Sequence, residues 1–256
     1  MTEISHELDI YNPAEYFASL GVLTALGSQY PDANLRSHFV VARHRGERNT
    51  TFIVQGEAVL CIGDVANQLA TATVVEDKMA NVWKNPKGNP KLISPVILKT
   101  DKWEIVLDWW LDELRWESNE LKFWGGNSTP LEMLRSFIKL GADFAEVGGT
   151  LFGFDARTIR DSLTVGYSKK DTGEKAGLYP LTELLCAIGL QRFRPRNQTY
   201  YAWMNPIPLS ITHAAATQQI LGLQQLRYQF EIMKISQGAK QAVSQTEEFA
   251  AASAGK

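Results

Sequence analysis

The chain has 256 residues, of which 45% are hydrophobic and 21% charged, and its formal net charge is −2. These values are ordinary for a globular protein, so they exclude a wholly disordered chain, and the length suffices for a sizeable core. No apolar run approaches the roughly 18 residues of a membrane span, and the first residues lack the basic-then-apolar order of a signal peptide. Cys61 and Cys186 lie in apolar runs, as buried and reduced thiols do, so we expect a cytoplasmic protein.

A strand and a helix are the first predicted elements. Residues 4–10 alternate apolar with polar side chains, which predicts a half-buried strand with His6 on its inward face. The Asn12-Pro13 pair then signals a helix start, and Glu15 is placed to reach back as in a capping box. We expect this helix to end at Gly27.

A hairpin and a short helix are predicted next. Two strand-like runs, 37–42 and 50–55, flank a basic turn at residues 43–48. Asp64 is the expected cap of a short helix that extends through Leu69.

The middle of the chain has the clearest alternation. Residues 103–112 alternate between two faces, and because a helix would scatter their acids around its surface, they predict a strand. The sequence Thr129-Pro130-Leu131-Glu132 is a capping box that predicts a second helix.

The last third repeats the opening order. A strand is predicted at 163–167 and a helix from Pro180, and both this helix and the first carry Glu-x₅-Gly, at residues 15–21 and 183–189. Glycine inside a helix costs about 1 kcal/mol relative to alanine, so each glycine is expected to permit close backbone approach. The pattern indicates either two β-α-β halves in tandem or a chance similarity of two helices.

A final strand is predicted at 226–232, and the Ala-, Gln-, Ser- and Gly-rich end is predicted to be disordered. The expected organisation is an N-terminal half at 1–80, a tryptophan-rich insert at 81–149, a C-terminal half at 150–236 and a tail at 237–256.

Charged residues are segregated along the chain. Acids gather between residues 104 and 120, whereas bases gather in three other places. Such asymmetry favours a surface that faces a polyanion, although solvated loops produce it too. The candidate contacts with nucleic acid are Arg36, Arg43, Arg45, Arg48, Lys84, Lys87, Lys91, Arg192, Arg194, Arg196 and Tyr201.

The arginines at 192, 194 and 196 form the most informative group. They alternate around Phe193 and Pro195, which places them on one side of an extended segment. Guanidinium groups suit phosphate, and the nearby aromatic side chains of residues 200–203 offer faces for unstacked bases. Alternatively, these arginines satisfy the terminal carbonyls of the preceding helix, and the aromatic residues belong to the core.

Several strings carry a resemblance to a known family. In order, they are Asn12-Pro-Ala-Glu-Tyr-Phe, Leu107-Asp-Trp-Trp-Leu-Asp-Glu, Leu121-Lys-Phe-Trp-Gly, Phe154-Asp-Ala-Arg, Val165-Gly-Tyr-Ser and Tyr179-Pro-Leu-Thr-Glu-Leu-Leu-Cys-Ala-Ile-Gly-Leu-Gln-Arg-Phe-Arg-Pro. In these strings, over about residues 7–236, the chain resembles a CRISPR-associated subunit family of the minor type I subtype once labelled U and now G. Gly-Leu-Gln-Arg-Phe-Arg-Pro is the most specific part. Gly125-Gly126-Asn127 departs from the alanine and glutamines that family members often carry there.

The resemblance implies an α+β fold of two ferredoxin-like (RAMP-type) β-α-β halves in tandem, with antiparallel sheets. It also implies membership of a Cascade-like effector ribonucleoprotein complex. The expected partners are CRISPR RNA and other effector subunits, with target DNA as a further candidate. We expect no cofactor, no metal and no membrane partner.

No set of residues predicts catalysis. Walker-type glycine loops and the spaced acids of two-metal nucleases are absent from the sequence, and Asp155 with Arg157 is compatible with a structural pair or a site. RAMP-like processing nucleases use histidine, which makes His44 the one catalytic candidate. The sequence therefore favours a non-catalytic RNA-binding subunit over a CRISPR-RNA-processing endoribonuclease or a bridging subunit that contacts protein only.

Overall fold

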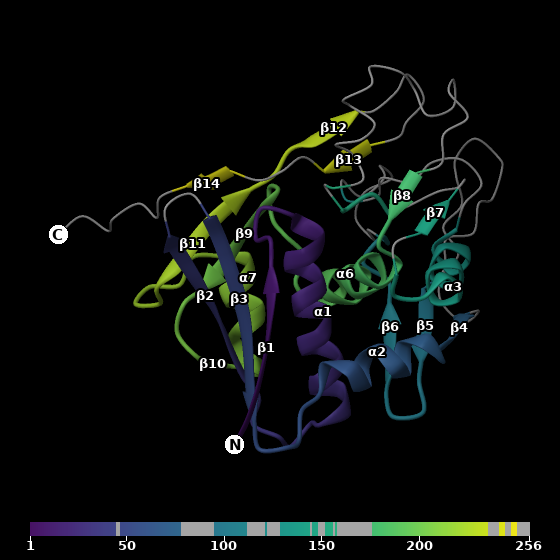
Figure 1. Ribbon diagram of the computed structural model, residues 1–256, viewed down its shortest axis with the longest axis horizontal. Helices are drawn as coiled ribbons and strands as arrows, with labels where there is room; N and C mark the ends of the chain where they lie inside the picture. Colours follow the sequence, from purple (N-terminus) through teal and green to yellow (C-terminus); the bar gives the residue numbers. More distant parts are fainter. Residues whose placement is uncertain are drawn as a thin grey trace.

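The computed structural model describes residues 1–44, 47–77, 95–111, 121, 129–143, 145–147, 152–155, 157, 176–234, 241–243 and 247–249. Helices and antiparallel sheets are mixed along this part of the chain, which confirms the predicted α+β class and the antiparallel pairing (Figure 1). The strand predicted at 163–167 lies outside the described residues, so that prediction stays open.

The first sheet contains the predicted hairpin. It has the order β1-β3-β2-β10 and is formed by β1 (Thr2–Leu8), β3 (Glu47–Gly56), β2 (Arg36–His44) and β10 (Ile207–Pro208). β1 pairs with β3 only as far as Leu8 opposite Thr50, whereas the β2–β3 ladder continues to His44 opposite Glu47. The basic end of the hairpin therefore extends as a two-stranded ribbon past the end of β1.

The second sheet is built from the C-terminal part of the chain. Its order is β14-β11-β9, formed by β14 (Glu247–Phe249), β11 (Gln225–Gln229) and β9 (Thr199–Trp203), and β12 (Ile232–Lys234) pairs separately with β13 (Gln241–Val243). The predicted strand at 226–232 is thus two strands. At β13 and β14 the predicted disordered tail is instead extended and paired, because β12 and β11 supply backbone partners that composition does not reveal.

A third sheet, β4-β5-β6, is formed by β4 (Thr73–Glu76), β5 (Val96–Lys99) and β6 (Glu104–Leu107), and β7 (Ala145–Val147) pairs with β8 (Ala176–Leu178). The strand predicted over 103–112 ends at Leu107, which corrects the prediction. Trp109 and Trp110 are both buried, and a strand would have sent one of these neighbours to the opposite face. The side-chain oxygen of Gln191 accepts hydrogen bonds from the backbone N–H groups of Asp108 and Trp109 and holds the chain in this turn.

The described helices are α1 (Pro13–Gln29), α2 (Ile62–Ala70), α3 (Pro130–Leu140), α6 (Pro180–Arg192) and α7 (Leu209–Thr217). The capping box predicted for α3 is confirmed, since Thr129 and Glu132 make both of its hydrogen bonds. The Asn12 side chain likewise caps α1 by accepting from the Ala14 N–H at 3.2 Å.

Three local predictions were wrong. α1 continues past Gly27, where a Cβ would lie 2.6 Å from a methyl carbon of Leu209, so this glycine makes room for packing rather than ending the helix. α2 begins after Cys61, and Asp64 lies within its first turn instead of capping it. Cys61 is exposed, because the apolar run around it leads into the start of a helix; Cys186 is buried as predicted.

α1 and α6 pack against each other in the middle of the molecule. The first sheet lies on one side of this pair, and α3 and the β4-β5-β6 sheet lie on the other (Figure 1). Buried apolar residues from the segments 1–80, 81–149 and 150–236 form one continuous core. The division of the chain at these boundaries stays a prediction.

The two glycines of the Glu-x₅-Gly pattern lie at the crossing of α1 and α6. A Cβ on Gly21 would lie 2.0 Å from the carbonyl oxygen of Leu185, and a Cβ on Gly189 would lie 2.0 Å from that of Phe17. Each of these carbonyls belongs to the residue four positions before the glycine of its own helix, so the contact is reciprocal. The predicted close backbone approach is confirmed, and each helix is the other's partner.

Candidate functional site

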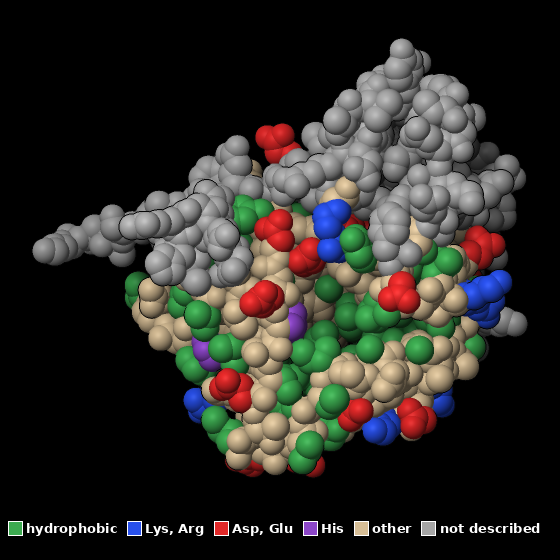
Figure 2. Space-filling model, viewed as in Figure 1, with side chains coloured by type: hydrophobic (Ala, Val, Ile, Leu, Met, Phe, Trp, Pro, Cys, Tyr) green, Lys and Arg blue, Asp and Glu red, His purple; other side chains and the backbone are tan. Residues whose placement is uncertain are grey.

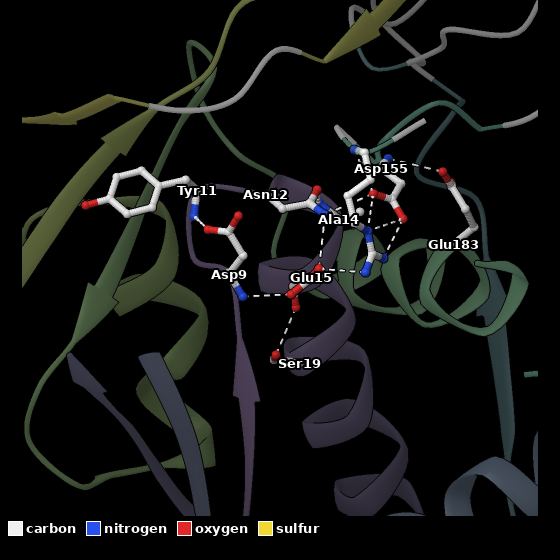
Figure 3. A network of polar contacts seen from close by, with 9 residues as sticks. Asp9, Tyr11, Asn12, Ala14, Glu15, Ser19, Asp155 and Glu183 are labelled. Atoms are coloured by element: carbon white, nitrogen blue, oxygen red, sulfur yellow. Dashed lines mark hydrogen bonds and ion pairs between the residues drawn. The ribbon is translucent and has the colours of Figure 1, made fainter. Parts of the chain in front are cut away.

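A buried polar network joins the first turns of α1 and α6 to the segment that contains Asp155 (Figure 3). Asp155 is fully buried and accepts a hydrogen bond from the Asn12 side-chain amide at 2.9 Å. The Arg157 guanidinium donates to the same carboxylate, with its Nη2 at 2.6 Å and its Nε at 2.9 Å. These charge-assisted bonds satisfy a carboxylate that would otherwise be costly to bury.

Arg157 also reaches α1. Its Nη1 lies 2.9 Å from Oε1 of Glu15, and its guanidinium lies 3.8 Å from the centre of the Tyr179 ring. Burial opposes the charge of Arg157, but the hydrogen bond and the charge of Asp155, with the charge of Glu15, raise its pKa. Glu15 does reach back, as predicted, although it accepts from the Asp9 N–H instead of closing a capping box.

Glu183, the corresponding glutamate of α6, is fully buried on the other side of the segment. Its Oε1 accepts a hydrogen bond from the Asp155 N–H at 3.1 Å, and its Oε2 has no hydrogen-bond partner within the described residues. Burial, and then the charge of Asp155, raise the pKa of Glu183 to about 8, so this side chain is protonated at neutral pH. The two glutamates of the repeated pattern therefore hold the segment from both helices.

The contacts of this network are those of a structural clamp. Asp155 and Arg157 neutralise each other, and Glu15 forms a second ion pair with the same guanidinium. Across the described residues, no three His, Cys, Asp or Glu side chains are grouped so that they could hold a metal ion. Of the two interpretations that the sequence left open for Asp155 and Arg157, the geometry favours the structural pair.

Arg194 and Arg196 are arranged as the alternation predicted, but the prediction was wrong for Arg192, which is the last residue of α6 and not part of the extended segment. Phe193 and Pro195 are buried, Arg192 and Arg194 are half-buried, and Arg196 is exposed. The backbone reverses immediately afterwards, because Asn197 and Gln198 have positive φ angles of 51° and 57° and the Thr199 N–H donates to the Arg196 carbonyl. The segment is thus a fixed extended run that leads into β9.

Arg192 is held within the fold. Its Nη2 donates to the carbonyl oxygen of Leu209 at 3.1 Å, and its own carbonyl is bonded to Nδ1 of His213. Burial lowers the pKa of Arg192. This arginine therefore has the structural role that the sequence left open as an alternative, although the carbonyl it satisfies belongs to α7 instead of its own helix.

Arg194 and Arg196 differ from Arg192. Neither forms an ion pair with the residues that the structure describes. They flank the buried Pro195 in the sequence, Arg194 half-buried and Arg196 exposed.

The aromatic residues near this segment are divided between core and surface. Tyr200 and Trp203 are buried, and they donate hydrogen bonds to the carbonyls of Ile10 and Ser37, each at 2.6 Å. Tyr201 is half-buried and lies opposite the exposed Arg227 in the β9–β11 ladder. Arg227 is not among the contacts predicted from the sequence, although its outward position in the alternating run 226–230 indicates an exposed cation.

The other residues that the sequence predicted to contact nucleic acid belong to other segments of the chain. Arg36 is exposed at the start of β2, where it pairs with Pro208, the neighbour of the residue that Arg192 contacts. Arg43 lies opposite Arg48 in the projecting part of the β2–β3 ladder, about 23 Å further along the strand at 3.3 Å per residue. Arg45, Lys84, Lys87 and Lys91 lie outside the described residues.

The histidines show one clear role. His6 is mostly buried, its Nε2 lies 2.8 Å from the hydroxyl oxygen of Ser19, and burial lowers its pKa, in agreement with the predicted inward position. His44 pairs with Glu47 through the backbone, and its side chain is not among those described.

Comparison of the chain with models of known protein families, with curated proteins and with solved structures found no match. Among the described helices, none has the length and apolar character needed to cross a membrane.

Proposed function

We propose that this protein is a non-catalytic subunit of a type I CRISPR effector, a Cascade-like ribonucleoprotein complex, and that it binds the backbone of CRISPR RNA and neighbouring subunits. The observation that carries the proposal is the placement of Arg194 and Arg196. Arg194 belongs to the most specific string of the family resemblance and Arg196 follows that string directly. Neither arginine has an acidic partner among the described residues.

The chemistry of this segment suits single-stranded RNA. Two guanidinium groups on one side of an extended chain can each contact a different phosphate of an RNA backbone. A single small anion would engage only one of them. Tyr201 and Arg227, neighbours across the β9–β11 ladder, add a half-buried aromatic ring and a further cation. Contacts of this kind read the backbone, so the proposed binding has little sequence preference.

The β2–β3 ribbon supports the same proposal. Arg43 and Arg48 occupy paired positions in the part of the β2–β3 ladder that continues past β1, and the sequence of this part is basic. Target DNA stays a second candidate polyanion for this end of the hairpin.

We also propose that the fold consists of two RAMP-like halves in tandem. The reciprocal glycine contacts and the paired roles of Glu15 and Glu183 support an origin of α1 and α6 in one repeated unit. α1 contacts β1 of the first sheet, and α6 contacts β6 of the β4-β5-β6 sheet, so the two helices lie beside different antiparallel sheets (Figure 1).

Incubation of the purified protein with labelled CRISPR repeat RNA tests the proposal against its two alternatives. We expect retention of intact RNA, with affinity that falls as salt rises. Specific cleavage of the repeat would favour the processing endoribonuclease. Absence of binding even at low salt would favour a bridging subunit that contacts protein only.

His44→Ala gives a sharper test of the endoribonuclease. Because no acid–base pair accompanies His44 in the sequence, we expect the level of mature guide RNA in cells that carry the whole complex to be unchanged. Northern blotting of the guide RNA measures this, with His213→Ala as a matched histidine control. Loss of mature guide RNA in the His44 variant alone would move the assignment to the enzyme.

A further inference from the structure

A long stretch of the chain carries no charged side chain. Residues 197–226 contain no Lys, Arg, Asp or Glu, although 21% of the whole chain is charged. The stretch includes α7 and the connection from α7 to β11. Many of its side chains are exposed, among them Asn205, Ser210, Ile211, Gln218, Gln219, Leu221 and Gln224.

Leu221 protrudes from this uncharged surface. It is 95% exposed, more than any other large apolar side chain in the described part of the chain. It occupies the second position of a β-turn in which the Leu223 N–H donates to the Ile220 carbonyl at 3.1 Å and Gly222 has a φ of 82°. The turn projects at the left of the molecule below β14 (Figure 1), where Figure 2 shows hydrophobic side chains among uncharged polar ones and backbone.

The turn is held rigidly from inside. The side-chain amide of Gln225 is buried, its nitrogen donates to the carbonyls of Ala215 and Gln218 at 2.7 and 3.1 Å, and its oxygen accepts from the Ile220 N–H at 2.7 Å. Ile220 and Leu223 pack against the core on either side of the exposed leucine. A single exposed apolar side chain is common, but one presented by a turn with this internal support loses little conformational freedom on binding.

We propose that the turn 220–223 is a docking anchor, with Leu221 inserted into an apolar pocket of a neighbouring protein subunit whose rim is polar and uncharged. The absence of charge argues for this occupant. A phosphate backbone needs cations that residues 197–226 lack, whereas the centres of protein interfaces are depleted of charged residues. A charged rim on the partner would find no counterpart here.

The assignment to a neighbouring subunit rests on the proposed function, and the test separates the two. The full-length protein is co-expressed with the products of the neighbouring open reading frames, and the assembly is measured by size-exclusion chromatography with light scattering. The variant is Leu221→Asp, and the control is Val59→Asp, which places the same charge at another apolar side chain that is 80% exposed. Thermal melting of each free variant reports folding.

We expect the wild type and Val59→Asp to co-elute with the other subunits, and Leu221→Asp to bind them about tenfold or more weakly while melting as the wild type does. Co-elution of Leu221→Asp at wild-type level would overturn the anchor and leave the proposed function standing. A wild type that joins no subunit would overturn the proposed function and this assignment with it. A self-dimer that Leu221→Asp abolishes would make a second copy the occupant, against the proposal.

Discussion

Glu183 holds a proton in the folded protein that an exposed glutamate would release. Because burial raises its pKa to about 8, above the ordinary 4.5, the native state binds more protons than the unfolded state between these values. The contribution of protonated Glu183 to stability is therefore complete below about pH 4.5 and is lost as pH rises through 8. The groups that face it are Asp155, Arg157 and Cys186.

Replacement of Glu183 by glutamine removes this proton uptake while nearly keeping the shape of the side chain. We expect the melting temperature of Glu183→Gln to fall less than that of the wild type between pH 5 and about 8.5. Glu7→Gln, at an exposed strand position, is the control and should follow the wild type. Parallel curves for Glu183→Gln and the wild type would show that Glu183 is ionised in the folded state.

The three arginines after α6 are expected to differ in their effect on stability. Arg192→Gln loses the hydrogen bond to the Leu209 carbonyl, so the free energy of unfolding should fall by about 1 kcal/mol. Arg194→Gln and Arg196→Gln should change it by no more than about 0.5 kcal/mol, as surface substitutions do. Urea unfolding of the three single variants measures the difference. Equal losses at all three positions would indicate that Arg194 and Arg196 are also structural.

At the scale of the elements, the crossing of α1 and α6 depends on the absence of two side chains. Alanine at Gly21 or Gly189 would place a carbon 2.0 Å from a backbone carbonyl, so the helices must move apart. Overpacking of this kind costs about 1–3 kcal/mol or more, which exceeds the gain of about 1 kcal/mol in helix propensity. We therefore expect both variants to be destabilised.

Gly63→Ala in α2 is the matched control, because its Cβ would lie no closer than 3.5 Å to the Cys61 sulfur. It should be neutral or more stable than the wild type by up to about 1 kcal/mol. Thermal and urea unfolding compare the three variants. A stabilised Gly21→Ala protein would contradict the close helix pair.

Elements whose signals lie within a few residues could be predicted from the sequence. The capping box at Thr129 is complete within one turn of helix, and the β2–β3 hairpin follows from two local runs. The strand predicted over 103–112 ended early because Trp109 and Trp110 are both buried by tertiary packing, which overrides their alternation.

The candidate site could be predicted only in part, because some of its contacts depend on residues far away in the chain. The outward alternation of Arg194 and Arg196 around Pro195 is a local property and was correct. The role of Arg192 depends on Leu209, seventeen positions away in the chain, and no local pattern contains that contact. No local pattern shows that Gly21 packs against α6 and Gly189 against α1. The sequence predicted only that another backbone comes close to each glycine.

At the scale of the whole molecule, the proposed RNA contacts and the proposed protein contact use separate parts of the surface. The helix pair and the buried clamp keep the arginine segment in place. The uncharged turn at 220–223 precedes the Gln225–Trp203 end of the β9–β11 ladder, whereas Arg194 and Arg196 precede the opposite end, at Thr199 and Gln229. Changes on the two faces should therefore act independently. Leu221→Asp should leave the affinity of the free protein for RNA unchanged within about twofold, which fluorescence anisotropy measures. A parallel loss of RNA affinity would contradict the separation.

The most direct test of the central claim is the salt dependence of RNA affinity for the wild type, for the double variant Arg194→Gln/Arg196→Gln and for the control Lys139→Gln, an exposed cation of α3. If each arginine neutralises one phosphate of single-stranded RNA, the slope of log affinity against log salt should flatten by about 1.4 in the double variant. Affinity for unrelated RNA sequences should fall to a similar extent, and the control should keep the wild-type slope. An unchanged slope in a double variant that melts as the wild type does would contradict RNA binding by this segment.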